Sequence, residues 1–155
     1  MIEGTAMPSP PTAIDSMVER CRRGEYPPMV GRMPSGWVVM GERQVFAGYC
    51  LLLPDPVVPH LNALSERARG QFLGDMTRLG DGLLSVVGAL RINYAVFGNL
   101  EPALHAHVIP RFADEPAATR TAQPWAFDWG AAPPFSESAH GRLRADIGAH
   151  IERFR

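Results

Sequence analysis

The segment Pro102–Arg111 constrains the fold more than any other part of the chain. Between Leu104 and Ile109, apolar residues alternate with two histidines, His105 and His107. Side chains of a β-strand point in turn to opposite faces of its sheet, so this period of two predicts a half-buried strand. The two imidazoles then share one face, and the apolar side chains on the other face pack into a core.

The remaining hydrophobic pattern predicts helices and strands in a single domain. Helices are expected over 13–23, from Ser65 to about residue 90, and near the C-terminus after Ser136 or Ser138, where apolar residues recur at helical spacing. Strands are expected over 36–41, 48–53, 91–97 and 104–109, with Pro110 ending the last one, and prolines predict loops at 54–60 and 113–135. This order predicts an α+β domain over 13–155 with a mainly antiparallel sheet, preceded by a disordered segment over 1–12.

Composition excludes several classes of partner. The chain has 155 residues with 15 basic and 16 acidic side chains, and it has no basic stripe, which argues against nucleic-acid binding. Its apolar runs are too short to span a membrane. The two cysteines, Cys21 and Cys50, lack metal-site spacing, and two free thiols indicate a reducing, cytoplasmic compartment.

The pair His105 and His107 permits more than one kind of chemistry. Neutral imidazoles can attack phosphorus, bind a metal ion or move protons near neutral pH. A zinc site would need a third ligand, and the sequence offers neither a cysteine pair nor a second His-x-His, so no metal site is predicted. Taken alone, a histidine such as His105 is more often a hydrogen-bonded residue of the core, and His107 could be a partner that only orients its neighbour.

The segment resembles the signature of the histidine triad (HIT) family, His-x-His-x-His with apolar residues between the histidines. His105 and His107 correspond to the last two histidines of that signature, and Ala103 stands where the first would be. Further blocks are similar to the diadenosine polyphosphate hydrolase branch of the family: 36–39, 44–54, 61–65 and 92–99. The resemblance runs from about Ser35 to Arg111.

The resemblance implies a HIT-like fold, usually homodimeric, and a nucleotide hydrolase or transferase acting at an α-phosphate. Substrates would be dinucleoside polyphosphates or nucleoside phosphoramidates. His105 would form a nucleotidyl-histidine intermediate and His107 would contact the α-phosphate. No cofactor is implied, although a divalent cation could accompany a polyphosphate substrate. Residues expected around phosphate and ribose are Asn93, Gly98, Asn99, Gln44 and Glu42.

Two residues depart from the common pattern. Tyr49 occupies a position that is histidine in many HIT proteins, and its hydroxyl could contact the histidines or simply pack. Ala103 lies two residues before His105, so it is expected on the same face. The resemblance implies that a histidine would fit at this position, because similar proteins have one there. The methyl group of Ala103 removes a polar side chain from the site. The loss is compatible with slower leaving-group chemistry, with a bulkier substrate, or with a nucleotide-binding module that has weak or no turnover. Arg111 could meet a distal phosphate or form an ion pair at the strand end.

Overall fold

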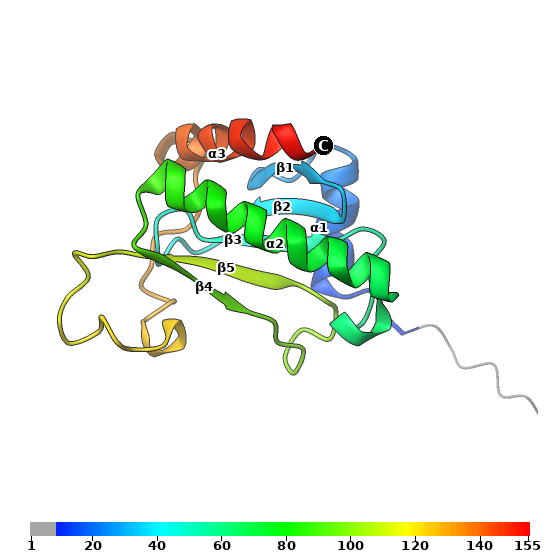
Figure 1. Cartoon of the computed structure of the whole chain (residues 1–155), viewed down its shortest axis with the longest axis horizontal. Helices are drawn as coiled ribbons and strands as arrows, with labels where there is room; N and C mark the ends of the chain where they lie inside the picture. Colours follow the sequence, from blue (N-terminus) through cyan, green and yellow to red (C-terminus); the bar gives the residue numbers. More distant parts are fainter. Residues whose placement is uncertain (1–8) are drawn as a thin grey trace, which may run out of the picture.

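The computed structural model describes residues 9–155, which form a five-stranded sheet with helices on both faces (Figure 1). The predicted disordered segment over 1–12 therefore lies largely outside the described residues. The elements are α1 (Ala13–Arg22), β1 (Met29–Met33), β2 (Gly36–Met40), β3 (Cys50–Pro54), α2 (Glu66–Val87), β4 (Arg91–Ala95), β5 (Ala106–Arg111) and α3 (Glu137–Ile151). Short 3₁₀ turns cover Leu61–Ala63, Pro124–Ala126 and Glu152–Phe154.

The sheet has the strand order β1-β2-β3-β5-β4, and all four neighbouring pairs are antiparallel. The predicted α+β class is confirmed. Helices α2 and α3 lie side by side across one face of the sheet (Figure 1). Their apolar sides bury Leu104, Ala106 and Val108 in the main core, as the alternation predicts. Helix α1 covers part of the opposite face, against Val39 and Leu53.

Helix starts follow the predicted caps. Ser65 accepts a hydrogen bond from the backbone of Ala68 at the start of α2, and Ser136 caps α3 in the same way. Helix α1 begins at a reciprocal capping box formed by Thr12 and Asp15. None of the helices within residues 9–155 is long and apolar enough to cross a membrane. Both cysteines are buried free thiols.

Several details of the strands differ from the prediction, including β3, which continues through Pro54, and β4, which ends at Ala95. Strand β1 was not predicted, because Gly31 and Arg32 interrupt its short apolar pattern. Strand β5 begins at Ala106, so His105 lies just before it. Pro110 does not end β5, which continues to Arg111 with Pro110 opposite Ile92. Strand β3 pairs with β5 only over 106–108, so β5 has no strand partner on that side at Pro110. Because no ladder hydrogen bond is needed there, the absence of a backbone N–H in proline is tolerated.

Candidate active site

The two histidines lie together on the sheet face opposite α2 and α3. Their ring centroids are 4.9 Å apart with 71° between the ring planes. His107 is paired with Leu51 of β3 on one side and with Ala95 of β4 on the other. The predicted strand alternation therefore brings both imidazoles to one place, near the middle of the β3-β5-β4 part of the sheet.

His105 is held in one tautomer by the backbone. Its Nδ1 lies 2.7 Å from the carbonyl oxygen of Ala103, and a carbonyl can only accept, so Nδ1 carries the proton and donates. The Nε2 atom of the neutral ring then keeps its lone pair. The side chain is 8% exposed, and burial together with this hydrogen bond limits its rotation. This is the arrangement that a nucleophilic imidazole needs.

His107 has a different partner, the hydroxyl of Tyr49, whose oxygen lies 2.7 Å from Nδ1. Burial, and to a smaller extent the neighbouring His105, lower the pKa of His107 from its ordinary value to about 4. His107 is therefore neutral at physiological pH. Of the two possibilities for Tyr49, a contact with the histidines or packing alone, the structure shows the contact, with His107.

Aromatic side chains enclose His107. The ring centroid of Trp125 lies 5.3 Å from that of His107, and Phe97 lies 6.3 Å away. Trp125 also contacts Phe97 and Trp129 edge to face. Sequence reasoning treated 113–135 only as a surface loop and missed these rings. The alternation of Trp125, Phe127 and Trp129 in an otherwise polar segment is the signal that could have revealed a packed segment.

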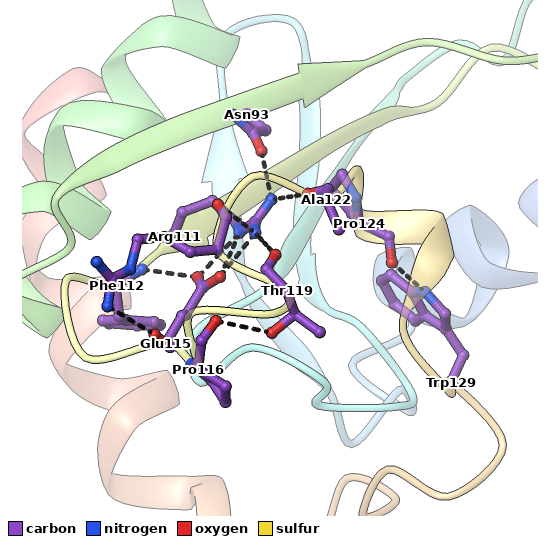
Figure 2. A network of polar contacts seen from close by, with 10 residues as sticks. Asn93, Arg111, Phe112, Glu115, Pro116, Thr119, Ala122, Pro124 and Trp129 are labelled. Carbon is purple, nitrogen blue, oxygen red and sulfur yellow. Dashed lines mark hydrogen bonds and ion pairs between the residues drawn. The ribbon is translucent and has the colours of Figure 1, made fainter.

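Arg111 anchors to the sheet the segment that carries Trp125, Phe127 and Trp129 (Figure 2). It is 6% exposed, and its guanidinium forms a buried ion pair with Glu115, with Nη2 donating to Oε2 at 2.6 Å. Nη1 donates to the side-chain oxygen of Asn93 at 3.1 Å and to the carbonyl of Ala122 at 2.9 Å, while Nη2 also reaches the carbonyl of Thr119 at 3.3 Å. Of the two expectations for Arg111, the structure shows the ion pair.

The nucleotide-binding residues expected from the sequence do not all gather at the histidines. Asn93 lies on the same face but holds Arg111. Gly98 and Asn99 lie in an exposed turn after β4. Glu42 accepts a hydrogen bond from the hydroxyl of Tyr26 at 3.0 Å. Gln44 is buried, and its amide is bonded to the backbone of its own loop, so the structure does not bring it to the histidines.

Ala103 is on the same face as His105, as expected, but α1 covers it. It is buried in a cluster with Ile14, Val18, Val39 and Leu53. A larger side chain here would have to fit into this packed cluster, and overpacking commonly costs about 1–3 kcal/mol. That a histidine fits at position 103 stays a prediction, and the burial of Ala103 means that its neighbours would have to make room for the larger ring.

A groove of about 890 Å³ runs beside β4, between the strand and the segment that Arg111 anchors. Its lining includes Asn93, Ala95, Phe97, Pro124 and Trp125. Phe97 and Trp125 also contact His107, so they separate the groove from the histidine pair. Within residues 9–155, no group of three or more His, Cys, Asp or Glu side chains is placed to hold a metal ion.

Comparison with solved structures identifies the architecture. A histidine triad protein from Marinobacter aquaeolei VT8 superimposes with a TM-score of 0.70 at 20% identity, covering 82% of this chain and 90% of the other. A hypothetical histidine triad nucleotide-binding protein from Sulfolobus tokodaii gives a TM-score of 0.69 at 15% identity, covering 89% and 92%. A zinc-bound histidine triad family protein from Mycobacterium smegmatis gives 0.63 at 15% identity, covering 92% and 100%.

No protein-family model matches the sequence, and no curated protein matches it significantly. At identities of 15–20%, the structural likenesses establish the fold. The chain has the α+β fold of histidine triad proteins.

Proposed function

We propose that the protein is a nucleotide hydrolase or transferase that acts at an α-phosphate and uses His105 as the nucleophile. The observation that carries the proposal is the hydrogen bond from Nδ1 of His105 to the carbonyl oxygen of Ala103, which leaves the Nε2 lone pair free. The nucleotide-binding description of the Sulfolobus tokodaii neighbour and the shared fold support the same class of ligand.

The proposed reaction has two steps. The nucleotidyl group is first transferred from the substrate to His105 and then from His105 to water. The Nε2 lone pair of His105 attacks the α-phosphorus, a P–Nε2 bond forms, and the bond from phosphorus to the leaving group breaks with its electron pair on the leaving group. An amine leaving group also takes up a proton from solvent, so that it departs as the neutral amine. Water then attacks phosphorus, the P–Nε2 bond breaks, and the water proton passes to solvent. Dinucleoside polyphosphates and nucleoside phosphoramidates both contain a bond from the α-phosphorus to a leaving group. No cofactor is needed for these steps, and a divalent cation would accompany a polyphosphate substrate as its counterion.

A nucleotide-binding module with weak or no turnover is the second candidate. Two observations favour it: a methyl group stands at position 103, and Trp125 and Phe97 close over His107. Both features would slow the departure of a leaving group or of a product, without removing affinity for a nucleotide.

Covalent trapping distinguishes these candidates. The protein is mixed with diadenosine tetraphosphate or with an adenosine phosphoramidate, quenched within milliseconds to minutes, and analysed by intact and peptide mass spectrometry. We expect one added nucleotidyl group on the peptide that contains His105. Binding of AMP without any adduct or product would favour the binding module instead.

We also propose that two chains form a homodimer through the β4 edge. Strand β4 is the last strand of the sheet, and large apolar side chains around it are exposed: Leu84, Leu90, Tyr94, Val96 and Phe97. Sedimentation at micromolar concentration is expected to give the mass of two chains, and Leu84→Glu on α2 is expected to shift it toward one. A monomeric wild type would contradict the proposal.

A cytoplasmic location is proposed because both cysteines are free thiols, which are typical of a reducing compartment.

A further inference from the structure

The loop between β2 and β3 is built to hold the side chain of Tyr49. The backbone N–H of Gly41 donates to the carbonyl of Tyr49 at 2.9 Å, and the N–H of Tyr49 donates to the carbonyl of Phe46 at 2.9 Å. Gln44 donates from Nε2 to the carbonyls of Gly41 and Tyr49 at 2.8 and 3.0 Å, and it accepts from the N–H of Gly48 at 3.1 Å. These bonds tie both ends of the loop together directly beside Tyr49.

The ring of Tyr49 is fixed as firmly as its backbone. It is 6% exposed, it lies against the backbone of Gly41 where any larger residue would collide with it, and it packs edge to face on Trp129 at 5.1 Å between centroids. The preceding Gly48 has φ of 94°, a backbone conformation that favours glycine. The ring is nearly parallel to that of His107, with 7° between the planes.

The direction of the bond between Tyr49 and His107 follows from what each atom can do. If Nδ1 of His107 carried the proton, the Tyr49 hydroxyl would accept, and its own proton would need another acceptor. Among residues 9–155, the hydroxyl has His107 as its one hydrogen-bond partner. A buried donor without an acceptor costs about 1–3 kcal/mol. Donation from the hydroxyl to the Nδ1 lone pair avoids this cost.

We infer that Tyr49 is a positioning residue that fixes His107 as a neutral imidazole with its hydrogen on Nε2. The two histidines are then opposite tautomers: His105 presents a lone pair at Nε2, and His107 presents an N–H at Nε2. One ring can attack phosphorus while the other donates a hydrogen bond to a phosphate oxygen, whose negative charge grows during the attack. The kinetic part of this inference rests on the proposed function, but the tautomer does not.

Tyr49 orients the His107 ring and sets its tautomer, and it does not transfer its proton. Burial raises the pKa of its hydroxyl above the ordinary value for tyrosine, so the buried tyrosinate that proton transfer would leave is disfavoured. The same burial keeps the hydroxyl a donor throughout the reaction. Gln44, which the sequence predicted to hold ribose, acts through Tyr49 by fixing the loop.

The test is the protonation pattern of the His107 ring in the ligand-free protein, read by ¹⁵N NMR of uniformly labelled full-length chain at pH 7. In the wild type we expect an unprotonated Nδ1 and a protonated Nε2 for His107, and the reverse for His105. A wild-type His107 with the proton on Nδ1 overturns the inference without any variant. This measurement needs no substrate, so it succeeds or fails separately from the proposed nucleotidyl transfer.

The variant Tyr49→Phe removes the hydroxyl and keeps the ring. We expect the His107 signals to move toward a mixture of tautomers while the His105 pattern stays unchanged, and kcat/KM to fall by about 10- to 100-fold, the range for loss of a residue that orients a functional histidine. The matched control is Tyr26→Phe, since Tyr26 is also buried but donates to Glu42. An unchanged His107 tautomer in a folded Tyr49→Phe protein, or an equal kinetic loss in Tyr26→Phe, contradicts the role of Tyr49.

Discussion

A His105→Ala variant is expected to lose nucleotidyl transfer by about 10⁴- to 10⁶-fold, because the nucleophile of a covalent mechanism has no substitute in its own site. The neighbouring His107 cannot replace it, since its Nδ1 is engaged by Tyr49 and its ring is turned 71° from that of His105. Pre-steady-state and steady-state rates with an adenosine phosphoramidate or diadenosine tetraphosphate measure the loss.

The controls separate chemistry from folding. His107→Ala is expected to reduce the rate less than His105→Ala, because it removes a hydrogen-bond donor to phosphate and leaves the attacking atom in place. His140→Ala should leave the rate unchanged, since His140 lies in α3 and its Nδ1 accepts from the backbone of Ser136. A folded His105→Ala protein that keeps wild-type turnover would exclude the proposed mechanism.

An Arg111→Ala variant is expected to lower the free energy of unfolding by about 3–5 kcal/mol, because it leaves the carboxylate of Glu115 buried without its partner. The guanidinium also holds the backbone carbonyls of Thr119, Arg120 and Ala122 and stacks over Phe46 at 5.1 Å and Phe127 at 5.3 Å. Denaturant unfolding measures the loss, and the fluorescence of Trp125 and Trp129 reports whether the segment leaves the sheet.

The chain contains a matched control for this ion pair. Arg142 and Asp146 are also four residues apart, at 3.9 Å, but the Arg142 side chain is 96% exposed. Solvent and salt screen such a pair, so Arg142→Ala should change stability by less than about 1 kcal/mol. Similar losses in the two variants would mean that burial of Arg111 does not carry the stabilisation.

The stabilisation that Arg111 provides is expected to decrease as the pH falls. Hydrogen bonds from Arg111 lower the pKa of Glu115, with a smaller contribution from the backbone N–H of Phe112. A carboxylate whose pKa is lower in the folded state stabilises the fold above its unfolded pKa, about 4.3, and this stabilisation is lost as pH falls through the folded value. The difference in stability between wild type and Arg111→Ala is therefore expected to narrow below about pH 4.

How much the sequence could reveal is clearest at the histidine strand. A period of two between Leu104 and Ile109 is a local property, because adjacent side chains of any strand point to opposite faces. It therefore placed His105 and His107 together, and it placed Leu104, Ala106 and Val108 in the core. The helix caps at Ser65 and Ser136 were equally local, since each serine bonds the backbone three residues ahead.

Residues whose partners are distant in the chain could not be assigned in this way. Gln44 and Ala103 were placed near a ligand by resemblance, yet the fold buries Gln44 in its own loop and packs α1 on Ala103. The exact ends of β4 and β5 and the continuation of β5 through Pro110 depended on which neighbouring strands were present. Periodicity contains no information about such neighbours.

The sequence by itself determined the fold class, the two faces of the histidine strand and the starts of the long helices, because each depends on residues within a few positions of one another. Only the tertiary structure decided the protonation of His107, because its partner is the hydroxyl of Tyr49 in the loop before β3. The partner of His105, by contrast, is a carbonyl only two residues away. The tertiary structure also decided that Arg111 holds the segment carrying Trp125 and Trp129. The direction of the His107 hydrogen bond and the burial of both rings arise only when distant segments meet, and these two quantities set the chemistry of the site.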